Sequence, residues 1–392
     1  MMIQAVLGNP NHPEYGVATI PFPIPHDQYA HCMELLEALE IGDAVKTDCK
    51  VEKIDSFYTV LKRAEMLTVN VEELNYLAKR LESFDTGEAA QFQAMAHKLE
   101  LFELKDFINL TFCCQQATVI TDFSDLAAVG RDHYMNLHGG SASVDELNKL
   151  DGEETARRLI ENGSGKITPY GVVYDNGMKL EQVYDGRFFP CYYYEPNVIT
   201  VAVTSKAEPE DTEHITWLFL PMEREEIDRA LLRGGITDPA DVRLRLEDSQ
   251  LPNEVDDMEC ETLSDLNELA AATDGLSKAD MEKLGAVVTL AEPKSAAQIK
   301  NLAENLDLFD FAPGTHTPEE YGKYMIRQSG HFDYDENLDA FYDYEKYGTE
   351  RMNAEDGMFT DRGYIAYKGY TSMEEVINGS QSSHMEMGGF SR

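Results

Sequence analysis

The residue types that carry out most enzyme chemistry occur in this chain without the spacing that such chemistry needs. The 392 residues contain no Walker loop, nucleophile elbow, glycine-rich dinucleotide motif or zinc-protease motif. His331 lies close to Ser329 with no third group to orient its ring, so a surface loop is expected there. Asp333–Tyr344 resembles the start of a calcium-binding loop, but it lacks the glycine at position six and the glutamate at position twelve. The sequence therefore predicts a non-enzymatic protein with no cofactor and no bound metal.

The cysteines are interpreted as structural residues. They are Cys32, Cys49, Cys113, Cys114, Cys191 and Cys260. They form no CxxC pair and no Cys/His metal spacing, which favours buried, reduced thiols in a cytoplasmic protein. The N-terminus has no basic segment followed by an apolar one, and no run approaches the ~20 apolar residues that span a membrane. We expect a cytoplasmic protein without membrane contact.

Carboxylates are the strongest chemical feature that remains. The chain has 72 Asp and Glu against 33 Lys and Arg, a formal net charge of −39. Residues 1–196 hold 31 acids and 16 bases, and residues 197–392 hold 41 acids and 17 bases, so the second half is the more anionic. Direct nucleic-acid binding is disfavoured, because a polyanion is bound through Lys and Arg that release its counterions. Such a charge suits high salt or a positively charged partner.

The acids gather in five clusters, and each has two readings. A single cluster is most simply a solvated face. Taken together, the clusters can match the charge density of duplex DNA, which is one charge per ~1.7 Å of axis. A basic DNA-binding cleft would then bind them as it binds phosphates. The residues expected to form this partner-binding face are Glu208, Glu210, Asp211, Glu213, Glu223, Glu225, Glu226, Asp228, Glu254, Asp256, Asp257, Glu259, Glu261, Asp333, Asp335, Glu336, Asp339, Asp343 and Glu345.

Two similar stretches indicate an internal repeat. Asp339–Gly369 matches Leu147–Gly177 at a shift of 192 residues, which aligns Gly363 with Gly171. The same shift aligns LSDLNELA (263–270) with VEELNYLA (71–78), and only small slips occur elsewhere. Repeats of this kind decide the architecture. The sequence predicts a first copy at residues 1–177, an aromatic connecting segment at 178–197, a more acidic second copy at 198–370 and a flexible tail at 371–392.

Hydrophobic periodicity predicts an α+β fold within each copy. Strands are expected at Ile3–Gly8, Gly16–Ile24, Val45–Phe57, Ile199–Thr204, Ile215–Met222 and Val242–Asp248. Helices are expected at His26–Ala38, Val71–Leu81, Glu88–Leu99, Leu104–Phe112, Thr121–Asn136, Glu223–Leu232 and Leu263–Ala270. Each copy should therefore consist of small β-sheet subdomains flanking a bundle of short acidic helices. The aromatic run Phe188–Pro196 is expected to pack and not to act as a flexible linker.

This order of elements, with its closing motif, resembles the ArdA family of antirestriction proteins. The motif reads Tyr344, Tyr347, Gly348, Gly357, Phe359, Gly363 and Ile365, and residues 198–370 carry the resemblance best. The first copy shows it only through its match to the second. The resemblance implies an elongated acidic mimic of bent B-form DNA, carried on mobile genetic elements, that occupies the DNA cleft of type I restriction–modification enzymes. It also implies three small subdomains per copy and dimerisation.

Two copies in one chain depart from the family pattern. We expect either a monomer with an internal pseudo-twofold axis or a homodimer. Three other interpretations stay open at this point. The chain is an acidic mimic or scaffold for another basic DNA-binding protein, a carboxylate-dependent hydrolase, or an ordinary protein with a salt-adapted surface.

Overall fold

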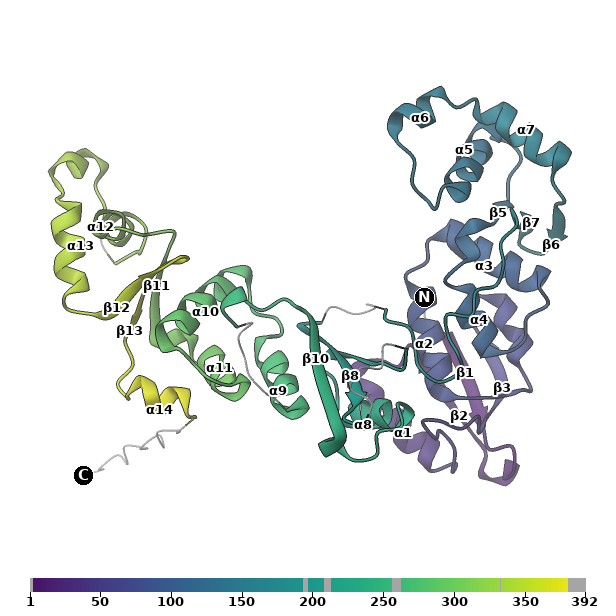
Figure 1. Ribbon diagram of the computed structural model, residues 1–392, viewed down its shortest axis with the longest axis horizontal. Helices are drawn as coiled ribbons and strands as arrows, with labels where there is room; N and C mark the ends of the chain where they lie inside the picture. The colour runs from purple at the N-terminus through teal and green to yellow at the C-terminus, as the bar shows by residue number, and fades with distance from the viewer. Residues whose placement is uncertain (1–2, 193–196, 208–212, 256–261, 332, 380–392) are drawn as a thin grey trace, which may run out of the picture. The chain divides into compact units, whose positions relative to one another are not determined.

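The computed structural model describes residues 3–192, 197–207, 213–255, 262–331 and 333–379. Of the chain, 46% is helical and 18% is strand, and the strands form several small sheets among many helices (Figure 1), so the predicted α+β class is confirmed. The residues form two compact units. The first comprises Met1–Tyr194, Val203–Trp217 and Glu223–Arg243, and the second comprises Glu195–Ala202, Leu218–Met222 and Leu244–Arg392.

The first unit begins with a four-stranded sheet in the order β2-β1-β3-β4. Its strands are β1 (Ile3–Gly8), β2 (Val17–Phe22), β3 (Cys49–Asp55) and β4 (Thr68–Val69). Alternate side chains face the core, because successive residues of a strand point to opposite faces of the sheet. Ile3, Ala5, Ile20 and Phe22 are fully buried as a result. The strands expected from the sequence here are confirmed, as is the helix α1 (Tyr29–Glu37) that follows β2.

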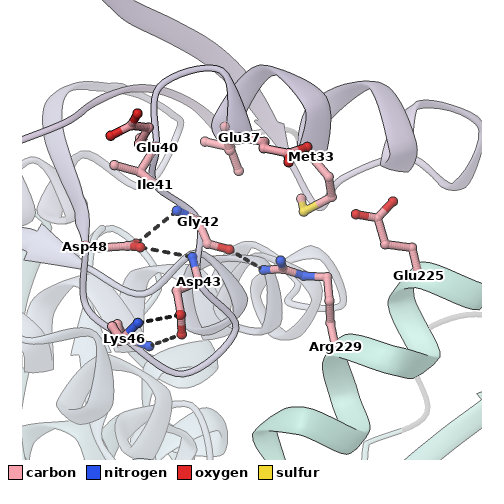
Figure 2. A pocket seen from close by; sticks show the side chains of 11 residues that line it. Met33, Glu37, Glu40, Ile41, Gly42, Asp43, Lys46, Asp48, Glu225 and Arg229 are labelled. Atoms are coloured by element: carbon pink, nitrogen blue, oxygen red, sulfur yellow. Dashed lines mark hydrogen bonds and ion pairs between the residues drawn. The ribbon is translucent and has the colours of Figure 1, made fainter. Parts of the chain in front are cut away.

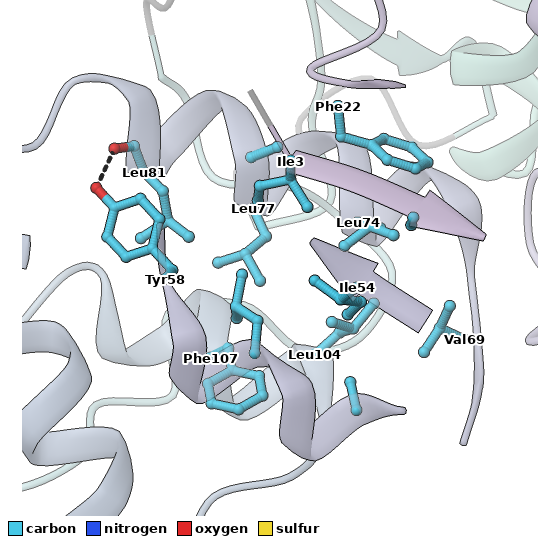
Figure 3. Packing of buried hydrophobic residues seen from close by; sticks show 14 of the residues in the cluster. Ile3, Phe22, Ile54, Tyr58, Val69, Leu74, Leu77, Leu81, Leu104 and Phe107 are labelled. Carbon is cyan, nitrogen blue, oxygen red and sulfur yellow. Dashed lines mark hydrogen bonds between the residues drawn. The ribbon is translucent and has the colours of Figure 1, made fainter. Parts of the chain in front are cut away.

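Three amphipathic helices complete this core. They are α2 (Val71–Glu82), α3 (Thr86–Lys98) and α4 (Leu104–Leu110). Asn70 starts α2 by accepting a hydrogen bond from the backbone N–H of Glu73, and a capping box starts α3. Figure 3 shows Ile3 of the sheet packed with Leu77 of α2 and Phe107 of α4, all of them fully buried. The helix spans expected for this region are confirmed within a few residues.

A smaller subdomain follows in the first unit. Its three-stranded sheet has the order β5-β7-β6, formed by β5 (Thr118–Ile120), β6 (Lys166–Thr168) and β7 (Gly171–Tyr174). Its helices are α5 (Leu126–Leu137), α6 (Val144–Lys149) and α7 (Gly152–Asn162). The helices α5 and α7 cross with their backbones in contact, since a Cβ on Gly130 would lie 1.8 Å from the carbonyl oxygen of Gly152. Only glycine allows this approach.

Residues 178–192 pack into the first unit. Tyr184 is fully buried, and its backbone N–H and C=O both bond to the side-chain amide of Asn109, at 2.8 and 3.1 Å. Phe189 stacks on Tyr76 with ring centroids 4.5 Å apart. These contacts satisfy backbone groups and bury aromatic area, so this segment is part of the core and not a free linker.

The helix α8 (Arg224–Arg233) also belongs to the first unit, where two of its arginines meet two adjacent glutamates of α2. Arg229 forms an ion pair with Glu72 at 2.6 Å, and Arg233 approaches Glu73 at 3.6 Å. The four side chains are between 6% and 17% exposed, so the charges lie in a largely desolvated contact. Residues four apart lie on one face of a helix, which is why both arginines reach α2.

The second half of the chain begins with a sheet of order β10-β8-β9. Its strands are β8 (Ile199–Ser205), β9 (Thr216–Leu220) and β10 (Val242–Ser249). Next come the helices α9 (Leu263–Thr273), α10 (Lys278–Ala291) and α11 (Ala296–Ala303). A second three-stranded sheet has the order β11-β13-β12, from β11 (Phe309–Pro313), β12 (Asp356–Thr360) and β13 (Gly363–Tyr367). The remaining helices are α12 (Pro318–Arg327), α13 (Tyr344–Met352) and α14 (Met373–Ile377). The strands and helices expected at residues 199–270 are confirmed.

Several local arrangements occur twice in the chain. The backbone N–H of Ile24 bonds to Asn75 at 2.8 Å, and that of Met222 bonds to Asn267 at 2.9 Å. The hydroxyl of Thr168 donates to the carbonyl of Gly171 at 2.8 Å, as the hydroxyl of Thr360 does to that of Gly363. Both glycines have positive φ, 127° and 140°, which other residues rarely adopt. The helices α12 and α13 also cross at a glycine, where a Cβ on Gly322 would lie 2.0 Å from the carbonyl oxygen of Tyr344.

Candidate functional site

The acids expected to face a partner fall into three groups in the structure. Four lie at or in α8, one lies in the 3-10 helix Asn253–Val255, and six lie between residues 333 and 345. Glu213 is exposed at the end of the turn before β9. Seven others lie outside the described residues, namely Glu208, Glu210, Asp211, Asp256, Asp257, Glu259 and Glu261. The partner-binding role of all these carboxylates stays a prediction.

Three of the carboxylates at or in α8 lie close to basic side chains of the first unit. Glu226 lies 3.6 Å from Lys79 of α2, and Glu223 lies 3.5 Å from the ring of His26. Asp228 lies 3.9 Å from Arg224 on its own helix. Acids in the first turn of a helix also interact favourably with its dipole. Most of this cluster therefore has a local role in holding α8, whatever partner it meets.

A shallow hollow of about 540 Å³ lies beside α8 in the first unit (Figure 2). Its lining residues are Met33, Leu36, Glu37, Glu40, Ile41, Gly42, Asp43, Lys46, Asp48, Glu225 and Arg229. The polar groups of its wall are largely committed to one another. Asp48 accepts from the backbone N–H groups of Gly42 and Asp43, each at 3.0 Å, and Arg229 donates to the carbonyl of Gly42 at 2.7 Å. The hollow thus has the character of a braced loop rather than a catalytic pocket.

Glu254 forms a two-pronged ion pair inside the second unit. Its two oxygens accept from Nε and Nη2 of Arg362 at 2.7 and 2.8 Å, across 108 residues of sequence. The Arg362 side chain lies against Gly285 of α10, where a Cβ would come within 2.3 Å of its Nε. The hydrogen bond from Arg362 lowers the pKa of Glu254 below its usual value of 4.5. This carboxylate ties the chain near residue 254 to the β12–β13 turn.

Replacing Glu254 with glutamine should destabilise the second unit by about 1–2 kcal/mol at neutral pH, because a charge-assisted, bidentate contact is lost. The folded-state pKa is lowered, so the contribution is present above about pH 4.5 and disappears as the pH falls through the lowered pKa. Urea unfolding of E254Q and of the parent at pH 7 and at pH 3 measures this. E350Q is the control, since Glu350 is 69% exposed and 4.0 Å from Lys346. An equal deficit at both pH values would contradict the assignment.

Asp339 is bound by three donors from the helical hairpin of the second unit, which consists of α12, α13 and the loop that joins them. Tyr344, Tyr334 and Arg327 all bond to its Oδ1, and the Tyr334 contact is 2.7 Å long. The bond from Tyr344, followed by those from Tyr334 and Arg327, lowers the pKa of Asp339 to about 2. Arg327 also lies over the rings of Tyr334 and Tyr344, 5.6 and 5.2 Å from their centroids. Asp339 therefore braces a loop through its Oδ1, although its side chain is still 36% exposed.

The other predicted acids between residues 333 and 345 are exposed. Asp335 and Asp343 accept backbone N–H bonds at the starts of the 3-10 helix Glu336–Phe341 and of α13, and both are exposed. Asp333, Glu336 and Glu345 are also exposed. Five of the predicted carboxylates are thus exposed within a stretch of thirteen residues, whereas Asp339 is bound by three donors.

Most basic side chains of the second unit have an acidic partner within it. Eight ion pairs join described cations to neighbouring carboxylates there. The cations are Arg245, Lys300, Lys323, Arg327, Lys346, Arg351, Arg362 and Lys368. Residues 244–392 contain 31 acids and 12 bases, so the carboxylates outnumber the cations that could pair with them. The uncompensated charge of this unit is strongly negative.

The other chemical candidates occupy structural positions. Cys32, Cys49, Cys113 and Cys114 are buried, as expected, while Cys191 is half-buried and Cys260 lies outside the described residues. Burial raises the pKa of the Cys114 thiol, which keeps it protonated and unreactive. The His331 ring lies 2.9 Å from Ser329 Oγ on an exposed loop. Within the part of the chain that the structure describes, no three His, Cys, Asp or Glu side chains gather as metal ligands would. No described helix is both long and apolar enough to cross a membrane.

The sequence alone does not single out the arginines that bind these carboxylates. Arg229 and Arg233 have a helical spacing that could have marked them as one face of α8. Nothing local, however, points to Glu72, which lies 157 residues earlier. Arg327 and Arg362 are single basic residues in acidic surroundings, and their partners are identified only by the fold.

The comparisons with known proteins gave a match that lies in the second half of the chain. No curated protein matches the chain. Residues 212–366, which run from before β9 to the next-to-last residue of β13, match the family model of the antirestriction protein ArdA.

Proposed function

We propose that this protein is an antirestriction protein whose acidic surface takes the place of DNA in the cleft of a type I restriction–modification enzyme. The observation that carries the proposal is the charge balance of the second unit, where acids outnumber bases and eight cations are tied up in internal ion pairs. The uncompensated carboxylates are then available to a basic partner. The family match at residues 212–366 supports a restriction–modification enzyme as the partner.

The physical basis is electrostatic complementarity. A DNA cleft lined by Lys and Arg attracts any surface that repeats the charge spacing of phosphates. Helices advance 1.5 Å per residue, so acids on exposed turns can approach that spacing. The role requires binding alone, with no bond made or broken, and the partner is a protein and not a nucleic acid. The cytoplasm, where restriction enzymes meet incoming DNA, is the proposed location.

We also propose that the chain is a tandem duplication, with copies at residues 1–177 and 198–370. Sheets of the same order support this, because β5-β7-β6 corresponds strand by strand to β11-β13-β12. The paired Asn75 and Asn267 contacts and the paired Thr–Gly turns support it further. The second copy, with its greater charge, is the main partner-binding copy in this proposal, and the first supplies the other half of a pseudo-twofold mimic.

Competition with DNA tests the function. The purified protein should displace DNA from a type I restriction–modification enzyme, and its apparent affinity should fall at least about 100-fold between about 50 and 200 mM salt. Duplex DNA without the recognition sequence is the control, because its affinity should fall with a similar slope. Uptake of unmodified plasmid by a restricting host should rise when the protein is expressed. Unchanged uptake together with no competition at low salt would exclude the proposal.

A further inference from the structure

The loop between α12 and α13 displays two large apolar side chains. Leu338 and Phe341 belong to the 3-10 helix Glu336–Phe341 and are 47% and 83% exposed. The loop is fixed because Asp339, which lies between them in the chain, accepts hydrogen bonds from Arg327, Tyr334 and Tyr344. A phenylalanine that is mostly in water gains nothing for the fold. An exposed aromatic on a braced backbone is typical of a preorganised contact.

The residues on either side of Leu338 and Phe341 in the chain are acidic. Exposed carboxylates flank them at Asp333, Asp335, Glu336, Asp343 and Glu345. Two of the nearby cations are engaged elsewhere in the hairpin, Arg327 with Asp339 and Arg351 with Glu355, while Lys346 lies 4.0 Å from Glu350 with both side chains 69% exposed. Apolar anchors inside a polar rim are the usual anatomy of a protein-binding hot spot.

We propose that Leu338, Phe341 and these five carboxylates form a contact patch, called here the Phe341 patch, for a basic protein. The aromatic ring enters an apolar recess, and the carboxylates meet Lys and Arg around the rim of that recess. The proposal rests on the proposed function, since it names the contact through which the restriction enzyme is held. The rim supplies long-range attraction, and the ring supplies a short-range contact that DNA itself cannot offer.

Charge selects a basic protein over the other possible occupants. A second copy of the chain, joined through the same patch about a twofold axis, would place five carboxylates against five others. An anionic lipid surface would be repelled in the same way. A basic cleft would attract the carboxylates of the rim and would also contact Leu338 and Phe341. It is also the kind of partner that the negative charge of the second unit favours.

The corresponding segment of the first copy lacks the residues that form the Phe341 patch. At a shift of 192 residues, Lys149 stands where Phe341 does, Glu146 where Leu338 does and Leu147 where Asp339 does. Met135 and Gly152 take the places of Arg327 and Tyr344, so no clamp of this kind can form there. The Phe341 patch is therefore a property of the second copy alone, and the two copies contact the enzyme differently in this proposal.

The test compares F341A with the parent in competition against DNA for a type I restriction–modification enzyme. F341A should bind at least about tenfold more weakly with an unchanged salt slope, because no charge has been removed. F123A is the matched control, since Phe123 is a 50% exposed phenylalanine in the corresponding subdomain of the first unit, and it should stay within twofold of the parent. Circular dichroism and thermal unfolding check that both variants fold like the parent.

The outcomes separate the two proposals. If the parent competes and F341A competes equally well, the patch is wrong while the proposed function stands. If the parent itself does not compete, both are wrong. If the parent sediments as a dimer and F341A as a monomer, the patch joins two copies of the chain, and the basic-partner assignment is overturned. D339A gives a second measurement, because it releases the loop while keeping Phe341; we expect an intermediate loss of affinity.

Discussion

Replacing Arg233 with alanine should destabilise the first unit by about 3–5 kcal/mol, because removal of one member of a buried ion pair leaves the other charge without compensation. Arg233 is 6% exposed and lies 3.6 Å from Glu73, whose hydroxyl partner Tyr184 is fully buried. Its guanidinium also lies over the ring of Phe189, 4.4 Å from the centroid. Burial raises the pKa of Glu73 even with the arginine present, so the carboxylate is poorly solvated.

The cost is high because Arg233 serves several buried acceptors at once. It donates to the carbonyls of Ala44 and Arg187, both at 2.9 Å, and to Asn70 Oδ1 at 3.0 Å. Alanine leaves the carbonyls of Ala44 and Arg187 in a cavity without this donor, whereas Asn70 Oδ1 keeps the backbone N–H of Glu73. An unsatisfied buried polar group costs about 1–3 kcal/mol. The side chain is therefore a central contact between α8, α2 and the segment at residues 178–192.

Urea unfolding followed by circular dichroism measures the loss, and hydrogen exchange over residues 224–233 locates it. R224A is the control on the same helix, since Arg224 is 95% exposed and should change stability by less than about 0.5 kcal/mol. The double variant E73L/R233M should recover only the part of the loss that comes from the uncompensated charge of Glu73, because methionine donates nothing to the carbonyls of Ala44 and Arg187. An R233A protein as stable as R224A would show that the network is not buried in solution.

Replacing Gly322 with alanine should destabilise the helical hairpin of the second unit by about 2–3 kcal/mol, because the new methyl group meets backbone. A Cβ there would lie 2.0 Å from the carbonyl oxygen of Tyr344 and 2.9 Å from its carbonyl carbon. Backbone cannot rotate aside as a side chain can, so α12 and α13 must separate. The separation outweighs the ~1 kcal/mol that alanine gains over glycine inside a helix.

Hydrogen exchange over α12 and α13 is the sensitive measurement, since the change acts on this crossing. G87A is the control, because Gly87 of α3 has only Asp85 Oδ1 within 3.2 Å of an added Cβ. That variant should be neutral or slightly stabilised. Unchanged protection of α12 and α13 in G322A would mean that the two helices do not cross as closely as the structure has them. G130A should reproduce the effect in the first unit, where the added Cβ meets Gly152.

Local patterns accounted for about half of the strands and α-helices. The alternation of apolar residues at Ile3–Gly8 and the 3.6-residue period at Val71–Leu81 are set by neighbours in sequence, so periodicity was enough to place β1 and α2. Cap residues such as Asn70 act within one turn of their helix, which makes helix starts readable. The 192-residue shift also indicated that Gly171 and Gly363 occupy equivalent turns, and both adopt positive φ.

The candidate site was only partly readable. The sequence counted the acids and located their clusters, since charge follows from composition. It could not distinguish Asp339 from Asp335 or Glu336 in the same run, although Asp339 is bound by three donors and the others are exposed. That difference depends on where Arg327 and Tyr344 come to lie once α12 and α13 cross.

By itself, then, the sequence determined the α+β class, the order of about half of the elements, the repeated spacing and the anionic character of this protein. Each of these follows from residue types and from contacts within a few residues. The tertiary structure alone decided which charges are neutralised, because Arg233 finds Glu73 and Arg362 finds Glu254 across more than a hundred residues. An ion pair depends on distance in space, and distance in space between remote residues is fixed by the packing of the whole unit.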